Sequence, residues 1–312
     1  MKRFIGIDIG GTKCAVVSGN FEVGVTDKIR FETASKDETL EQIFRAVEGL
    51  MPAEAIGISC GGPLDERRGV IQSPPNLPGW DDVHITEELE RRFGIPAKLL
   101  NDANAGAIAE WKFGAGQGCE NMLFLTFGTG LGAGLILGGR LYSGTNGNAG
   151  EIGHIRLAAD GPIGYGKAGS FEGFCSGGGI AKLAQSICSA ALESGNPIGF
   201  ADSEEKIAEI DTKMLAELAH GGDEDAKRIF DISAEKLGEG LSVVIDILNP
   251  EKIVIGGVYS RAADLFAAGM NRVLQRETLR QSLGVCEIVP AKLGEEIGDI
   301  AALSVAIVAG EN

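Results

Sequence analysis

The feature of this sequence that most restricts its fold is a glycine- and threonine-rich turn that occurs twice, each time after a short apolar segment. The first turn is Asp8-Ile9-Gly10-Gly11-Thr12-Lys13, which ends the apolar residues 4–9. The second spans 126–134 and follows apolar residues from 122 onward. Glycine allows a tight turn between strands and lets backbone N–H groups approach a ligand. We therefore predict two lobes, each beginning with a β-hairpin that has a Gly/Thr-rich tip.

The rest of the pattern alternates strands with helices, which is typical of an α/β protein. In the first half we expect strands at 4–9, 14–18, 22–31, 55–60 and 97–100, with helices at 37–50, 86–93 and 103–111. Thr86-Glu87-Glu88 is expected to cap the second of these helices. In the second half we expect strands at 122–127, 132–137, 252–255 and 285–289, an open loop at 138–179, and helices from 180 onward, including 223–248, 261–280 and 299–309. The predicted domains are a small lobe of residues 1–115 plus 298–312 and a large lobe of residues 116–297.

Composition excludes several classes of function. The chain has 28 Lys and Arg against 44 Asp and Glu, a net charge of −16, so neither a nucleic-acid partner nor an anionic membrane is expected. The six cysteines are scattered without a C-x-x-C pair, which is typical of a reduced, cytoplasmic protein. Residues 122–139 are uncharged for 18 positions, but their glycines favour two buried strands over a membrane span. Asp8 interrupts the first apolar run, so no export signal is expected.

The repeated turns favour phosphate binding. Bare backbone, hydroxyls and Lys13 suit a phosphate group, although a hairpin turn with a surface lysine explains the first turn equally well. Neither turn is a Walker loop or a Rossmann G-x-G-x-x-G. A third glycine turn, Gly256-Gly257, is a packing corner or a ligand contact. Asn101-Asp102 ends a strand before a helix, where it serves as an N-cap, as a general base, or as both.

The glycine-rich loop carries three further candidates: Glu151, His154 and Glu172. A carboxylate and an imidazole three residues apart can bind a metal, move a proton or hydrogen-bond a polyhydroxylated ligand. His84 and His220 are expected to be structural.

Together these motifs resemble the ROK family of bacterial sugar kinases and sugar-responsive repressors. The resemblance rests on Asp-x-Gly-Gly-Thr, Asn-Asp-Ala-Asn-Ala at 101–105, the Gly/Thr run at 126–134 and Gly-Glu-Ile-Gly-His at 150–154, in the family's order. It implies a two-lobed actin/hexokinase-like (ribonuclease H-like) ATPase fold with an interlobe cleft. The implied activity is ATP-dependent phosphorylation of a hexose, as in a glucokinase, by a homodimer or homotetramer.

The resemblance also implies roles for single residues. Asp102 is the implied catalytic base, and Mg²⁺ is implied near Asp8. The implied sugar-binding residues are Asn101, Asp102, Glu151, His154, Glu172 and the backbone near Gly62. The implied ATP-binding residues are Asp8, Gly10, Gly11, Thr12, Lys13, Thr129, Gly130 and Gly132 at the phosphates, and Gly256 and Gly257 at the adenosine.

Two departures from the family pattern change what is expected. Many relatives bind structural zinc through the motif histidine and three cysteines, but the corresponding positions here are Ile163, Tyr165 and Ser170. Because His154 alone cannot hold zinc, we predict a zinc-free loop. Asp8 also leaves no room for the DNA-binding segment of family repressors, so a repressor is not expected.

Several alternatives stay open at this point. Kinases for N-acetylmannosamine, N-acetylglucosamine, fructose, mannose or allose share the motifs, and polyphosphate is a conceivable second phosphoryl donor. A non-catalytic sugar sensor would not require Asp8, Asp102 and both phosphate turns together. An actin-like filament subunit would not require Glu151 and His154.

Overall fold

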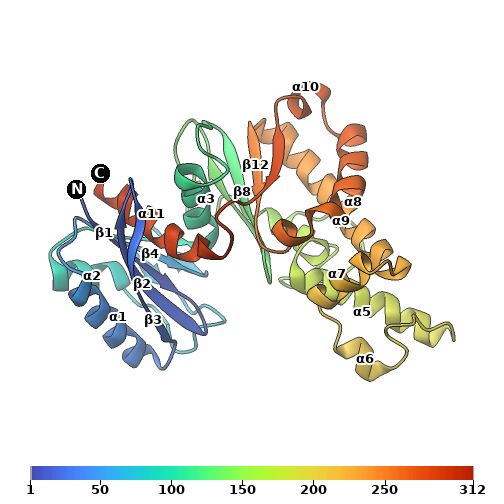
Figure 1. Cartoon of the computed structure of the whole chain (residues 1–312), viewed down its shortest axis with the longest axis horizontal. Helices are drawn as coiled ribbons and strands as arrows, with labels where there is room; N and C mark the ends of the chain where they lie inside the picture. Colours follow the sequence, from blue (N-terminus) through green and yellow to red (C-terminus); the bar gives the residue numbers. More distant parts are fainter. Residues whose placement is uncertain (1, 312) are drawn as a thin grey trace. The chain divides into compact units, whose positions relative to one another are not determined.

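The computed structural model describes residues 2–311, and these form two compact units (Figure 1). The first unit consists of the chain up to Glu120, Gly134–Ala149 and the chain from Lys292 onward. The second consists of Asn121–Ala133 and Gly150–Ala291. Strand β9 (Leu131–Ile136) begins in the second unit and ends in the first. The lobe boundaries at 115 and 298 stay a prediction.

A five-stranded sheet forms the centre of the first unit. Its strands, in the order β3-β2-β1-β4-β7, are β3 (Gly24–Glu32), β2 (Lys13–Asn20), β1 (Phe4–Ile9), β4 (Ile56–Cys60) and β7 (Ala97–Asn101). Strands β1, β2 and β3 are antiparallel neighbours, which confirms the predicted hairpin, whereas β1, β4 and β7 run parallel. The carboxyl ends of β1, β4 and β7 therefore lie at one edge of the sheet.

The two faces of this sheet are covered by different helices. Helices α1 (Lys36–Leu50) and α2 (Ile85–Phe93) share one core with Ile5, Ile7 and Ile9 of β1. Helix α11 (Ile297–Gly310) packs on the other face, where glycines let its backbone come close (Figure 1). A Cβ atom at Gly57 would lie 2.1 Å from the backbone nitrogen of Ala306. The sheet therefore requires glycine there for close packing.

The second unit is built on a four-stranded sheet in the order β13-β12-β8-β9. Strand β12 (Lys252–Ile255) runs parallel to both β8 (Met122–Phe127) and β13 (Glu287–Pro290). If β8, β9, β12 and β13 are matched to β1, β2, β4 and β7, the strand order is the same in both units. The structure thus confirms a duplication of topology.

Helices and short elements complete the two units. In the first unit these are β5 (Leu64–Asp65), β6 (Val70–Ile71), α3 (Asp102–Phe113) and η2 (Gly294–Glu296). In the second they are η1 (Ile152–His154), β10 (Ile163–Gly164), β11 (Lys167–Ala168), α4 (Phe171–Phe174), α5 (Gly177–Glu193), α6 (Glu204–Ala208), α7 (Thr212–His220), α8 (Glu224–Leu248), α9 (Val258–Glu277) and α10 (Arg280–Leu283).

Three local expectations were wrong. Thr86 does not cap α2, because the helix begins one residue earlier, after His84, which makes no side-chain cap. The predicted helix 261–280 begins at Val258 and ends at Glu277, and extended backbone at Thr278 separates it from α10. The loop at 138–179 is not open throughout, because it contains η1, β10, β11, α4 and the start of α5.

Candidate active site

Two of the predicted carboxylates approach each other at the edge where the parallel strands end. Asp8 lies at the end of β1, and its pKa is raised to about 6 by burial, by the charge of Asp299 and by the charge of Asp102, while Lys28 and Arg30 oppose the shift. Burial also raises the pKa of the Cys60 thiol, with smaller contributions from Asp102 and Asp8. The structure thus brings Asp8 and Asp102 within electrostatic range of each other.

Asp102 is the first residue of helix α3. Asn101 is the N-cap, since its Oδ1 accepts the backbone N–H of Asn104 at 2.7 Å. Asp102 Oδ1 accepts the N–H of Ala103 at 2.9 Å. Residue 102 is exposed as a whole, yet enough protein surrounds its carboxyl that desolvation raises the pKa of Asp102. A carboxylate with a raised pKa is a better proton acceptor near neutral pH.

Glu66 contacts this turn and was not predicted from the sequence. It lies between β5 and β6, and its Oε1 accepts the N–H of Asn101 at 3.0 Å and the Nδ2–H of Asn104 at 2.7 Å. The contacts span 35 and 38 residues of chain, and no motif in the sequence signals them.

The first Gly/Thr turn is braced by neighbouring backbone. Gly10 donates its N–H to the carbonyl oxygen of Lys13 at 3.1 Å, and the Thr33 hydroxyl donates to the Gly10 carbonyl at 2.6 Å. A Cβ atom at Gly11 would lie 2.6 Å from the carbonyl oxygen of Asn76. Residues 11–13 are exposed at the tip, so Thr12 and Lys13 are available to a ligand. Gly62, which follows β4, is also exposed.

The second Gly/Thr turn makes different contacts within its own unit. The Thr126 hydroxyl accepts the N–H of Gly132 at 3.1 Å, and Glu172 Oε2 accepts the N–H of Leu131 at 3.0 Å. A Cβ atom at Gly130 would lie 2.7 Å from Glu172 Oε2. The structure thus places Glu172 directly against the turn that contains Thr129, Gly130 and Gly132.

Gly256 and Gly257 lie beside this same turn. Gly257 has a φ of 63°, and a Cβ atom there would lie 2.0 Å from the carbonyl oxygen of Phe127. Gly256 donates its N–H to Leu125 at 2.9 Å. Gly256 and Gly257 therefore form a tightly packed corner, as the structural interpretation predicted. The corner also lies next to the candidate phosphate turn, so a role in ligand contact stays a prediction.

The loop around His154 is held together by contacts within the protein. The His154 ring meets Tyr165 edge-on at 5.2 Å between centroids, and Lys167 Nζ donates to the His154 carbonyl oxygen at 2.6 Å. Ser170 is fully buried, and its Oγ accepts the N–H of Gly173 as the N-cap of α4. Glu151 is exposed. Within residues 2–311, no group of three or more His, Cys, Asp or Glu side chains is arranged to hold a metal.

The other two histidines lie next to carboxylates at the surface. His220 Nε2 is 3.0 Å from Asp264 Oδ2, and His84 lies between Asp82 and Glu87 at 3.5–3.6 Å. Both are far from fully buried and contact no predicted site residue in these pairs. The structural interpretation of these histidines is therefore retained.

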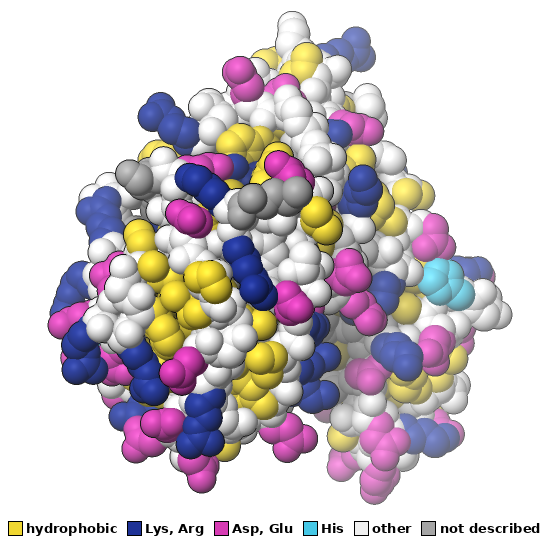
Figure 2. Space-filling view, turned by 60° about the vertical axis from the view of Figure 1, so that its left-hand side comes forward, with side chains coloured by type: hydrophobic (Ala, Val, Ile, Leu, Met, Phe, Trp, Pro, Cys, Tyr) yellow, Lys and Arg dark blue, Asp and Glu magenta, His cyan; other side chains and the backbone are white. Residues whose placement is uncertain are grey.

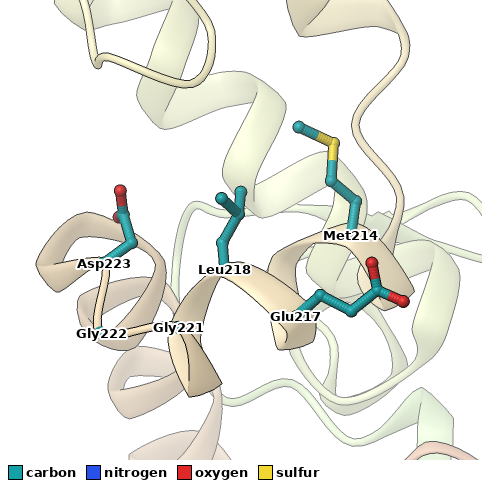
Figure 3. A pocket seen from close by; sticks show the side chains of 6 residues that line it. All are labelled: Met214, Glu217, Leu218, Gly221, Gly222 and Asp223. Atoms are coloured by element: carbon teal, nitrogen blue, oxygen red, sulfur yellow. The ribbon is translucent and has the colours of Figure 1, made fainter.

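A cavity of about 610 Å³ lies where α7 meets the start of α8 (Figure 3). Its lining is Met214, Glu217, Leu218, Gly221, Gly222 and Asp223. This lining contains two carboxylates and no basic side chain, so it is unsuited to a polyphosphate. It also contains none of the predicted site residues.

The surface carries charges of both signs. On the face shown in Figure 2, Lys and Arg side chains are interspersed with Asp and Glu.

None of the helices within residues 2–311 combines the length and the apolar character that crossing a membrane requires.

The duplicated units and their Gly/Thr turns define a protein of the actin/hexokinase-like ATPase class, as predicted. Residues 4–308 match the ROK family, and the chain belongs to that family. It is 31% identical to a glucokinase of Thermotoga maritima, over 97% of this chain and 96% of the relative.

Two solved structures are similar over nearly their whole length. The ROK hexokinase of Thermus thermophilus has a TM-score of 0.81 and 31% identity, covering 99% of this chain and 100% of that one. A ROK family glucokinase from Streptomyces griseus, solved in complex with glucose and AMPPNP, has a TM-score of 0.76 and 31% identity, covering 97% and 99%. Both support the fold class.

Proposed function

We propose that this protein is an ATP-dependent hexose kinase, with glucose as the first substrate to test and glucose 6-phosphate as its product. A sugar kinase is the class of enzyme that the family and the glucokinase relatives support. The single observation that carries the proposal is the placement of Asp102 at the carboxyl end of β7, within electrostatic range of Asp8.

The proposed reaction is a single in-line phosphoryl transfer. Asp102 accepts the proton of the C6 hydroxyl as the hydroxyl oxygen forms a bond to the γ-phosphorus of ATP. The bond from that phosphorus to the β,γ-bridging oxygen breaks, which releases ADP. General bases of this kind contribute on the order of 10²–10⁴-fold to the rate.

Binding residues are proposed for each substrate. In the first unit, Asn101 and the backbone near Gly62 would hold sugar hydroxyls, and Gly10, Gly11, Thr12 and Lys13 would contact phosphates. In the second unit, Glu151, His154 and Glu172 would hold sugar hydroxyls, Thr129, Gly130 and Gly132 would contact phosphates, and Gly256 and Gly257 would contact adenosine. Carboxylate oxygens and an imidazole are suitable acceptors for hydroxyl groups.

Asp8 fits the role of a Mg²⁺ contact. Its ionised form is disfavoured by burial and by the charges of Asp299 and Asp102, so a nearby cation would relieve an unfavourable electrostatic energy. Mg²⁺ prefers oxygen ligands and, when bound with ATP, would supply neutralisation of charge on the phosphate oxygens. Zinc does not fit the loop around His154, because Ile163, Tyr165 and Ser170 offer no thiolate.

The decisive experiment is sugar-dependent release of ADP across a panel of glucose, mannose, fructose, allose, N-acetylglucosamine and N-acetylmannosamine. We expect turnover with glucose, and a kcat for Asp102→Asn that is lower by about 10²–10⁴-fold with the glucose Kd little changed. Asp37→Asn, at a side chain that is 88% exposed, is the matched control.

Each outcome of this experiment has a defined meaning. Turnover with another hexose would reassign the substrate. Sugar binding without turnover would identify a sensor, and ATP-dependent assembly without a sugar requirement would identify a filament subunit. Full turnover in Asp102→Asn would eliminate the assigned base.

We also infer a cytoplasmic homo-oligomer, a dimer or tetramer. Within residues 2–311 the cysteines form no disulfide, which is typical of a reducing compartment. Sedimentation velocity of the purified protein tests the oligomeric state, and a monomer at micromolar concentration would contradict it.

A further inference from the structure

We propose that Glu66 is a positioning residue that fixes the turn bearing Asp102. This inference rests on the proposed function, since it takes Asp102 to be the catalytic base. Glu66 lies outside every motif that carries the resemblance to sugar kinases. It comes from the short segment between β5 and β6, which contacts the end of β7 from another part of the chain.

Three hydrogen bonds close a ring around the backbone of Asp102. Glu66 Oε1 accepts the N–H of Asn101 at 3.0 Å. Asn101 Oδ1 accepts the N–H of Asn104 at 2.7 Å. The Nδ2 group of Asn104 donates back to the same Glu66 oxygen at 2.7 Å. The residue before Asp102 and the residue two after it are therefore tied to one carboxylate.

Asn104 depends on Glu66. Its side chain is fully buried, and its Oδ1 has no hydrogen-bond partner within residues 2–311. The orientation of the amide follows from chemistry, since an ionised carboxylate only accepts hydrogen bonds and the NH₂ group must face it. Removing the carboxylate would take away the hydrogen bond of the buried NH₂ group as well, which is costly.

The position of strand β7 in the sheet explains why its end needs a hydrogen-bond partner from outside the sheet. It is an edge strand, with β4 as its one neighbour in the sheet. The N–H of its last residue, Asn101, is satisfied by Glu66. Without that contact the strand end would be free to fray, and the direction of the Asp102 side chain would vary.

The effect of Glu66 is expected to be geometric. The pKa of Asp102 is raised chiefly by burial and is lowered by backbone hydrogen bonds, so it does not depend on a Glu66 charge. A neutral side chain of the same shape should therefore preserve the function. Glu66→Gln keeps an oxygen that can accept both hydrogen bonds, whereas Glu66→Ala keeps neither.

The chain offers a matched control at the other end of the same strand. Glu90 Oε1 accepts the N–H of Ala97, the first residue of β7, at 3.0 Å. Glu90→Ala therefore removes the same type of bond from the same strand without touching the Asp102 turn. If Glu66 only stabilised the strand, Glu66→Ala and Glu90→Ala would have a similar kcat.

The test measures kcat and KM with glucose and ATP for wild type, Glu66→Ala, Glu66→Asp, Glu66→Gln and Glu90→Ala. We expect Glu66→Ala to lower kcat by about 10–100-fold, the scale of a small misplacement of a reacting group, with the KM for ATP unchanged. Glu66→Asp has a shorter side chain that cannot reach both donors, so its kcat should lie between those of wild type and Glu66→Ala. This variant is the test if Glu66→Ala does not fold. Glu66→Gln and Glu90→Ala should stay within about threefold of wild type.

A double-mutant cycle separates positioning from general stability. If Glu66 acts through Asp102, Glu66→Ala should have no further effect on kcat in the Asp102→Asn background. Additive losses of kcat in the double variant would overturn the inference. So would a kcat of Glu66→Gln as low as that of Glu66→Ala, or a kcat of Glu66→Ala as high as that of Glu90→Ala.

Amide hydrogen exchange tests the ring without any turnover. Peptides covering residues 97–104 should exchange faster in Glu66→Ala than in wild type, and unchanged protection would overturn the hydrogen-bond argument. If wild type has no activity with any hexose, the proposed function fails, whereas the exchange result still decides whether Glu66 orders this turn.

Discussion

Replacing Asp8 with asparagine should stabilise the protein near neutral pH while impairing catalysis. Burial, with the charges of Asp299 and Asp102, raises the pKa of Asp8 from 3.8 to about 6. Each unit corresponds to about 1.36 kcal/mol, so ionising Asp8 costs the folded state up to about 3 kcal/mol. Asparagine has the same shape without the charge, and we expect a gain of about 1–3 kcal/mol above pH 7.

The pH dependence gives this prediction its sign. Because the folded pKa lies above the unfolded one, the stability contributed by protonated Asp8 is fully present below about pH 3.8 and is lost as the pH rises through about 6. The advantage of Asp8→Asn over wild type should therefore be about one fifth developed at pH 4, about half developed at pH 5 and complete at pH 7.5.

Urea denaturation at these pH values, in EDTA and without nucleotide, measures the difference. Asp37→Asn is the control, because its side chain is 88% exposed, and we expect a change within about 0.5 kcal/mol. An Asp8→Asn variant that is no more stable than wild type at pH 7.5 would refute the electrostatic argument.

Three further predictions concern packing and the loop near His154. Gly57→Ala should destabilise the protein by about 1–3 kcal/mol or more in urea, because the new Cβ would meet the backbone of Ala306, whereas Gly49→Ala, with open space around it, should be neutral or slightly stabilising. Ser170→Ala should cost about 1–2 kcal/mol, since it removes a buried N-cap. Metal analysis of protein purified without added zinc should find none, and one bound equivalent would contradict the zinc-free loop.

Local sequence signals predicted most strands and helices but not the contacts that brace the site. The hairpin tips and the Asn101 cap were predictable because turn and cap preferences depend on neighbouring residues. Glu66 was missed because it reaches the Asp102 turn across 35 residues. The effect of Asp299 on the pKa of Asp8 was also missed, because Asp299 comes from the other end of the chain. Its ion-pair partner, Lys28, is 271 positions away in the sequence.

At the start of α2 a local sequence signal was present, but the prediction drawn from it was wrong. Thr-Glu-Glu is typical of a helix N-terminus, but Ile85 is fully buried in the core of the first unit. Its burial extends the helix by one residue, so Thr86 lies inside α2, where its hydroxyl is 3.5 Å from the carbonyl oxygen of Gly69. Packing of an apolar residue outweighed the cap preference.

The electrostatics of the first unit bear on which function the fold serves. Folding does not require a carboxylate at position 8, because burial and the charges of Asp299 and Asp102 all disfavour its ionised form. A sugar sensor that never neutralises phosphate charge would be more stable with an uncharged side chain there. A kinase has a reason to accept that cost, because a cation and a triphosphate would turn the same unfavourable charge into a binding contact. The energetic cost at Asp8 therefore favours catalysis over sugar binding alone.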